Sequence, residues 1–140
     1  PLCAAGQFGT GASFGFSPAV RADGVTPAAD PHLPQPLWFK DYAVDVEQAD
    51  PDSMLALYRA ALAIRQESLT ATRDTTAEQV DMGDDVVAYT RAAVGGRVFT
   101  SITNFGNAPV ALPDGSVVLA SGPLTPEGQL PTDTSAWVIK

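Results

Sequence analysis

Positive charge, cysteine and histidine are all scarce in this chain. Its 140 residues hold 8 Lys and Arg against 16 Asp and Glu, a formal net charge of −8, with one cysteine and one histidine. Nucleic acids and anionic membranes are bound through clustered cations, so we expect neither as a partner. The single cysteine, Cys3, excludes an internal disulfide. Nothing in the composition points to an oxidising compartment, and we expect a cytoplasmic protein.

Long apolar runs and the signatures of catalytic sites are missing as well. No stretch of about 18 apolar residues occurs and no basic-then-apolar leader suggests secretion, so we expect no membrane span. His32 is the only histidine, which excludes a confident Ser-His-Asp relay or a multi-histidine metal site. Glycine-rich nucleotide-binding motifs and paired-cysteine motifs do not occur. We therefore expect no cofactor, no metal ion and no catalytic residue within the chain.

Residues 1–49 are instead rich in glycine, proline and aromatic residues. They hold eleven of the 24 Gly and Pro residues of the chain. Segments such as "PHLPQPLWF" restrict the backbone too often for a regular helix, yet the region is too aromatic for a solvated linker. We predict a long irregular loop over 1–49 whose aromatic side chains rest on a surface: Phe8, Phe14, Phe16, Trp38, Phe39 and Tyr42.

Residues 50–67 show the one strong helical pattern. Asp50 is a suitable N-cap, Pro51 suits the first helical position, and Asp52 adds negative charge at the positive end of the dipole. A wide apolar arc, typical of a helix between two layers, is formed by Met54, Leu55, Leu57, Tyr58, Ala61, Leu62 and Ile64. Arg65 falls within this arc. Either its stem packs while its charge reaches solvent, or it pairs with an acid and braces two layers.

Residues 74–140 alternate short apolar runs with turn residues, as strands do. We predict strands at 86–91, 97–104, 108–112, 116–120 and 135–139. Gly95 and Gly96 suit one tight turn, and residues 113–115 suit another. The fold class predicted for the chain is mainly β: a small antiparallel β-sandwich or curled sheet, preceded by a single amphipathic helix and the irregular loop. Trp137 alternates with apolar neighbours in the last strand, so we expect it in the core.

The acidic residues do not suggest a catalytic pair. Asp81, Asp84 and Asp85 lie in "DMGDD", which lacks the alternating oxygen ligands and terminal Glu of a dedicated calcium loop. An exposed β-turn is the favoured interpretation. Asp50 and Asp52 are expected to act as cap and dipole charges only.

The order of these pieces resembles the C-terminal end of an actinobacterial α-glucosidase, a member of the α-amylase-type glycoside hydrolases. The resemblance rests on "FGFSP", "PHLPQPLWF", "ITNFG" and above all "DPDSMLALYRAALAIR". It implies that 50–67 is the last helix of a (β/α)₈ barrel, 74–140 the antiparallel domain C, and 1–49 the loop after the eighth barrel strand. The family's catalytic Asp, Glu and second Asp would all precede residue 1. The opening "PLCAAGQFGTG" departs from the family pattern, because it lacks the usual tryptophan.

The preferred hypothesis is therefore a C-terminal part of an α-glucosidase-like enzyme that supports the barrel and is inactive alone. The resemblance implies retaining hydrolysis of short α-glucoside oligosaccharides by the parent. Trp38, Phe39 and Tyr42 are candidates for contact with sugar or with the barrel. The alternatives are a stand-alone carbohydrate-binding β-module and an oligomerising module. If no barrel covers the helix, we expect either self-association through its apolar face or collapse of the 1–49 loop over it.

Overall fold

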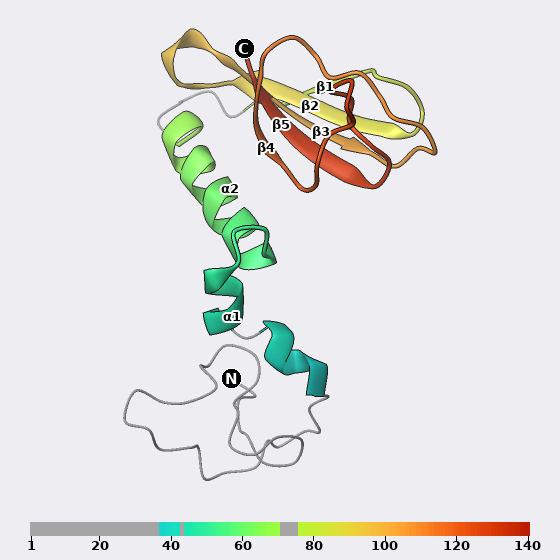
Figure 1. Ribbon diagram of the computed structural model, residues 1–140. Coiled ribbons are helices and arrows are strands. Elements are labelled where there is room, and N and C mark those ends of the chain that lie inside the picture. The colour runs from blue at the N-terminus through green and yellow to red at the C-terminus, as the bar shows by residue number, and fades with distance from the viewer. Residues whose placement is uncertain (1–36, 43, 71–75) are drawn as a thin grey trace. The chain divides into compact units, whose positions relative to one another are not determined.

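The computed structural model describes residues 37–42, 44–70 and 76–140, drawn in colour in Figure 1. The chain divides into two compact units, Pro1–Arg59 and Ala60–Lys140. The expectations for Cys3, His32 and the aromatic residues before position 37 lie outside the described residues. Among the helices at 37–42, 44–49 and 54–68, none combines the length and hydropathy required of a membrane span.

The first unit contains two short helices where an irregular loop was predicted. A 3₁₀ helix, η1, spans Leu37–Tyr42, and an α-helix, α1, spans Val44–Ala49 (Figure 1). The prediction of an irregular loop was therefore wrong for residues 37–42 and 44–49. It was drawn from the glycine and proline content averaged over 1–49, whereas the stretch 37–49 contains neither residue. Without these two residues, nothing interrupts helical backbone geometry.

The predicted long helix is present as α2, Met54–Ser68, but its start and its cap differ from the prediction. The Ser53 hydroxyl accepts a hydrogen bond from the backbone N–H of Ala56 at 3.1 Å and donates one to the Glu47 carbonyl at 2.6 Å. Ser53 is thus the N-cap. The Asp50 carboxylate accepts from the N–H of Asp52 at 2.9 Å, so it closes the preceding turn instead.

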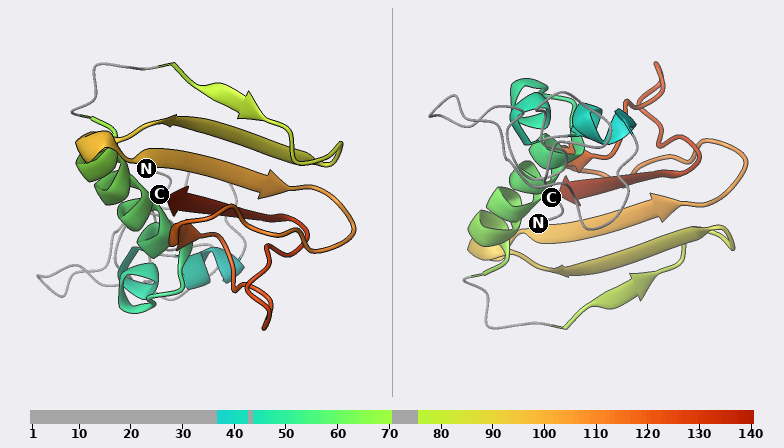
Figure 2. Two further views of the ribbon diagram at one scale, coloured as in Figure 1. Left: turned by 90° about the horizontal axis from the view of Figure 1, so that it is seen from above. Right: turned by 90° about the horizontal axis from the view of Figure 1, so that it is seen from below.

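The second unit is built on a five-stranded antiparallel sheet, which confirms the mainly-β fold class. Its strands are β1 Glu78–Val80, β2 Val86–Ala92, β3 Val98–Asn104, β4 Ser116–Ala120 and β5 Thr134–Ile139. Their order across the sheet is β1-β2-β3-β5-β4, and every neighbouring pair is antiparallel (Figure 2). The last strand in sequence therefore lies inside the sheet, between β3 and β4. Four of the five predicted strands are present within one residue of their predicted bounds.

A β-sandwich was predicted, with a second layer of strands over the first. In the residues that the structure describes, loops form this second layer. Residues 108–112 do not form the predicted strand; Val110 makes one isolated bridge with Leu130, with backbone N···O distances of 3.0 and 2.8 Å. Pro109 lies within this segment and Pro113 directly follows it, and neither has an N–H to give to a ladder. Its apolar side chains still pack on the core beside Leu124. The alternation that suggested a strand therefore marks burial, not strand pairing.

The sheet is packed on both faces. Under the loops lies a core cluster made of Val86, Ala88, Ile102, Leu130, Ala136 and Val138. On the opposite face, Phe99 and Ile139 form a smaller cluster with Ala93, and Leu69 and Trp137 pack against it. Trp137 is partly buried, and its ring meets the Phe99 ring edge-on at a centroid distance of 5.2 Å. It therefore belongs to this second cluster.

Both predicted turns are present. Gly95 and Gly96, with φ of 79° and 73°, lie in the short 3₁₀ turn η2, Val94–Gly96, that joins β2 to β3. Gly115, with φ of 144°, directly precedes β4. Such values favour glycine because it has no Cβ to clash with the backbone.

Candidate functional site

Two of the three aromatic residues proposed for sugar or barrel contact, Trp38 and Tyr42, meet on η1. Trp38 and Tyr42 are four residues apart in this short helix, and their rings lie edge to face at a centroid distance of 5.8 Å and an interplanar angle of 86°. Both are exposed, at 58% and 62%. Phe39 is the third candidate; the structure describes its backbone in η1 but not its side chain. Edge-to-face rings form a rigid apolar surface, which suits docking on another apolar surface or on a sugar ring.

A second apolar surface runs along α2. Met54, Tyr58 and Leu62, spaced four residues apart, are exposed at 58%, 63% and 57%. The other members of the predicted arc, Leu55, Leu57, Ala61 and Ile64, are only partly buried. We call Met54, Tyr58 and Leu62 the α2 stripe. A stripe of this kind is normally covered in a folded protein.

Arg65 continues the α2 stripe and is exposed. No ion pair of Arg65 is found within the described residues. Its backbone carbonyl accepts hydrogen bonds from the N–H of Leu69 at 3.0 Å and from the hydroxyl of Thr70 at 3.3 Å. The geometry agrees with the interpretation that its charge lies in solvent.

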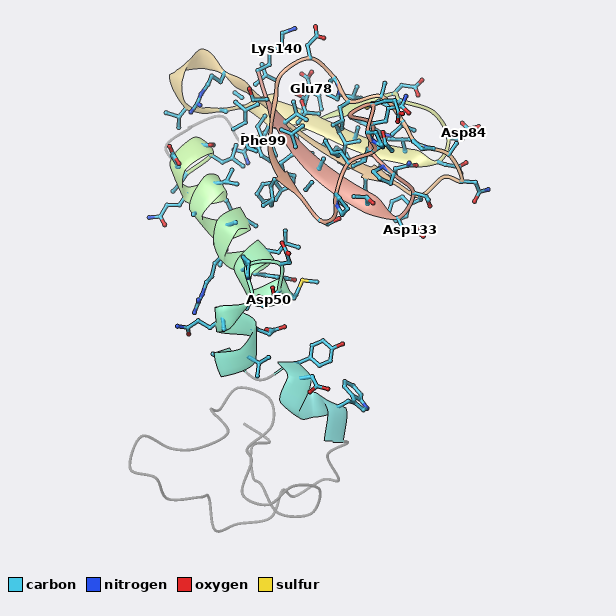
Figure 3. The ribbon with its side chains drawn as sticks, viewed as in Figure 1. Asp50, Glu78, Asp84, Phe99, Asp133 and Lys140 are labelled. Atoms are coloured by element: carbon cyan, nitrogen blue, oxygen red, sulfur yellow. The ribbon has the colours of Figure 1, made fainter. Side chains whose placement is uncertain are left out.

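The carboxylates are spread over the surface. Asp81, Asp84 and Asp85 form the expected exposed turn, in which the N–H of Gly83 donates to the Asp81 carboxylate at 3.1 Å. Figure 3 shows Glu78, Asp84 and Asp133 well apart from one another. Within residues 37–42, 44–70 and 76–140, no three His, Cys, Asp or Glu side chains come together in a way that could hold a metal ion.

A surface cavity of about 320 Å³ lies beside β1 and the turn from β2 to β3. Its charged lining residues are Glu78, Arg91 and Arg97, and threonines and apolar residues complete it. Glycoside hydrolysis requires two carboxyl groups on opposite sides of the bond. This cavity has one, so it does not fit such a site. Sequence reasoning did not identify this cavity, because it forms where β1, unpredicted, pairs with β2.

No family model and no curated protein matches the chain, but solved structures do. The trehalulose synthase MutB from Pseudomonas mesoacidophila MX-45 is 25% identical, with a TM-score of 0.62, over 86% of this chain and 24% of its own. The isomaltulose synthase SmuA from Protaminobacter rubrum is 21% identical over 81% and 22%, with a TM-score of 0.62. A mutant of Bacillus licheniformis trehalose-6-phosphate hydrolase (TreA) is 20% identical over 81% and 23%, with a TM-score of 0.64.

These neighbours are α-amylase-type glycoside hydrolases. The resemblance predicted from the sequence is therefore confirmed, and the chain has the fold of a domain of that family. It spans about a quarter of the length of the structures it matches, 24% in the case of MutB. The activities that their names give differ from one another and from α-glucosidase. The comparison thus supports the family and leaves the specificity open.

Proposed function

We propose that this chain is the C-terminal part of an α-glucosidase-like enzyme of the α-amylase type, with a structural rather than a catalytic role. In this proposal α2 is the last helix of the catalytic barrel, and the five-stranded sheet with its covering loops is domain C. Two observations support it: the match covers most of this chain and about a quarter of the longer enzymes, and α2 precedes the sheet in the order that the resemblance implies.

The observation that carries the proposal is the lack of a hydrophobic core in the described part of the first unit. Trp38, Tyr42, Val46, Met54 and Tyr58 are exposed there, Leu55 and Leu57 are only partly buried, and the one buried residue described there is Ser53. The sheet unit, by contrast, buries nine apolar residues, from Val86 to Ile139. Helices with an uncovered apolar face require another surface. A barrel packed against this unit would provide that surface.

The proposed structural role follows from the placement of the acidic groups. A retaining glycosidase holds its two carboxyl groups about 5 Å apart across the glycosidic bond. Among the described residues, the surface cavity beside β1 presents a single carboxyl group, that of Glu78. In the parent enzyme we propose retaining hydrolysis of short α-glucoside oligosaccharides by carboxylates that precede this chain. We also propose a cytoplasmic location, supported by the single cysteine.

Two measurements test the proposal. Incubated with a chromogenic α-glucoside, the chain should give the rate of buffer alone, and turnover that depends on Glu78 would contradict the structural role. The coding sequence upstream of Pro1 should encode a barrel with its catalytic carboxylates. A start codon immediately upstream, with no barrel before it, would overturn the assignment as part of a longer enzyme.

A carbohydrate-binding module is the second candidate function, because Trp38 and Tyr42 form an exposed, rigid aromatic surface. Such surfaces stack on sugar rings. Titration with maltotriose would then change the tryptophan fluorescence, and Trp38→Ala would abolish the change while Trp137→Phe would not. No change in the wild-type chain would exclude this candidate.

A further inference from the structure

The turn that leads into β4 contains an aspartate followed by a glycine, Asp114 and Gly115. In the described ranges 37–42, 44–70 and 76–140, Asp114 is the one aspartate that precedes a glycine. Its side chain is 91% exposed, and Gly115 is exposed as well. A carboxyl group in this position can react with the backbone nitrogen of the next residue, and glycine has no side chain to shield that nitrogen. The pair therefore has the residue types that such a reaction requires.

The Gly115 nitrogen is also available. Within the part of the chain that the structure describes, no hydrogen bond of the Gly115 N–H is found. By contrast, the N–H of Val86, which follows Asp85, donates to the Gly83 carbonyl at 3.2 Å. A backbone N–H that already donates a hydrogen bond is a poorer nucleophile, so Asp85 lacks the free neighbour that Asp114 has.

The Asp114 carboxylate is restrained only weakly. Its Oδ2 lies 3.3 Å from Nζ of Lys140, and the Lys140 side chain is 68% exposed. Ion pairs between side chains as exposed as these contribute little energy. The carboxyl group can therefore leave Lys140 and turn toward the main chain.

We propose that Asp114 is a site of spontaneous isomerisation to isoaspartate. The Gly115 nitrogen attacks Cγ of the protonated carboxyl group, and the carboxyl hydroxyl leaves with the amide proton as water. The new C–N bond closes a five-membered succinimide ring. Water then opens the ring at the backbone carbonyl carbon of Asp114, so the chain continues through Cβ and Cγ and the α-carboxylate becomes free. One water molecule leaves and one enters, so the mass is unchanged and no oxidant or cofactor takes part.

The product fits the turn poorly. Isoaspartate adds one carbon atom to the main chain directly before Gly115. A Cβ on Gly115 would lie 2.7 Å from Cγ1 of Val138 and 2.8 Å from the carbonyl oxygen of Ile139, so the backbone already lies close against β5 here. A longer chain therefore displaces the start of β4, where Ser116 pairs with Ile139. The modification destabilises this edge of the sheet.

Peptide mapping of the whole folded chain tests the proposal. The chain is kept at physiological temperature and neutral pH, then digested with an endoproteinase that cleaves before aspartate but not before isoaspartate. Cleavage before residue 114 should fall with time at constant mass. Asp133 is the internal reference, because the nitrogen after it belongs to Thr134, which is β-branched and 8% exposed. Isoaspartate should form several-fold faster at position 114 than at position 133. Asp23 also precedes a glycine, and its peptide is scored separately.

Asp114→Glu is the matched variant. Glutamate keeps the negative charge beside Lys140, but its side chain would have to close a six-membered ring, which forms far more slowly. The aged wild-type chain should unfold at a lower temperature than the fresh one, whereas aged Asp114→Glu should keep its unfolding temperature. Asp133→Glu is the control and should lose stability on ageing as the wild-type chain does.

Two results would overturn the proposal. One is isoaspartate at position 114 in the urea-unfolded chain but not in the folded chain, which would mean that the turn protects the Gly115 nitrogen. The other is an equal fall in unfolding temperature for aged wild type and aged Asp114→Glu, which would assign the loss to another residue. Neither result bears on whether the chain is part of a longer enzyme.

Discussion

The side-chain Nδ2 of Asn104 lies 3.1 Å from the carbonyl oxygen of Leu130, and both residues are completely buried. The same nitrogen also donates to the carbonyls of Ala108 at 2.9 Å and Pro131 at 3.1 Å, while Oδ1 accepts from the N–H of Gly106 at 2.9 Å. Asn104 therefore connects the end of β3 to both loops that cover the sheet. Its amide carries both donors and an acceptor, as this position requires.

Replacement of Asn104 should destabilise the sheet unit strongly. Asn104→Leu keeps a side chain of similar size but leaves the Gly106 N–H and the loop carbonyls without their partner. Each unsatisfied buried group costs about 1–3 kcal/mol, so we expect a total loss of about 3 kcal/mol in urea unfolding. The control is Asn107→Leu at an exposed position of the same loop. Equal effects of the two substitutions would contradict the connecting role of Asn104.

Gly115 should tolerate no side chain. A Cβ there would lie 2.7 Å from Cγ1 of Val138 and 2.8 Å from the carbonyl oxygen of Ile139, in a backbone with φ of 144°. Gly115→Ala is expected to cost about 3 kcal/mol from the clash and the strained backbone together.

Gly128→Ala is the matched control for Gly115→Ala. Gly128 has φ of 77°, and a Cβ there would meet nothing within 4 Å. It should cost about 1 kcal/mol, since only the backbone preference is lost. Thermal unfolding of the two variants separates clash from conformation. If both variants unfold at the same temperature, the close approach of the introduced side chain to Val138 does not destabilise the fold.

Trp137 should stabilise the second face of the sheet through Phe99. Trp137→Ala removes the edge-on contact and part of the cluster, so we expect a loss of about 2–4 kcal/mol. A double-mutant cycle with Phe99→Leu should give a coupling energy of about 0.5–1.5 kcal/mol. Tyr89→Ala, on the same face but 47% exposed, serves as the control and should have a small effect. A stability-neutral Trp137→Ala combined with a sugar-dependent fluorescence of Trp137 would favour a binding surface there.

Ser53, and not Asp50, should control the start of α2. Ser53→Ala loses both the bond from Ala56 and the bond to Glu47, and should lower helix stability by about 1 kcal/mol. Asp50→Ala loses only the turn bond to Asp52 and should cost about half as much or less. Thermal melts followed at a helix wavelength compare the two. A larger loss of stability for Asp50→Ala would support Asp50 as the N-cap, as the sequence predicted.

Features decided within a few residues could be predicted from the sequence. The strands at 86–92, 98–104, 116–120 and 134–139 follow from alternation between turn residues, and the body of α2 follows from its apolar spacing. The same is true of the exposed turn around Gly83. The helices at 37–42 and 44–49 were predictable in principle, because no glycine or proline occurs in that stretch.

Contacts between distant segments were decided by the tertiary structure alone. Pro109 and Pro113 are local signals against a strand at 108–112, but the place of this segment on the core depends on Leu130, which bridges Val110 from twenty residues away. The same holds for the choice of Ser53 over Asp50 as cap, since Ser53 also bonds to Glu47 in α1. The partners of Asn104 include residues 26 and 27 positions later.

The physical reason is the range of the forces involved. Backbone preference and periodicity act over one or two turns of chain, so they determine which residues form an element. Which elements meet depends on burying apolar area and pairing polar groups between them, and many arrangements satisfy the local rules equally well. Insertion of β5 between β3 and β4 leaves both faces of that strand buried, with Ala136 and Val138 on one side and Trp137 and Ile139 on the other. The alternating sequence of β5 is compatible with this arrangement. The arrangement itself is determined by the loops and neighbouring strands that cover β5.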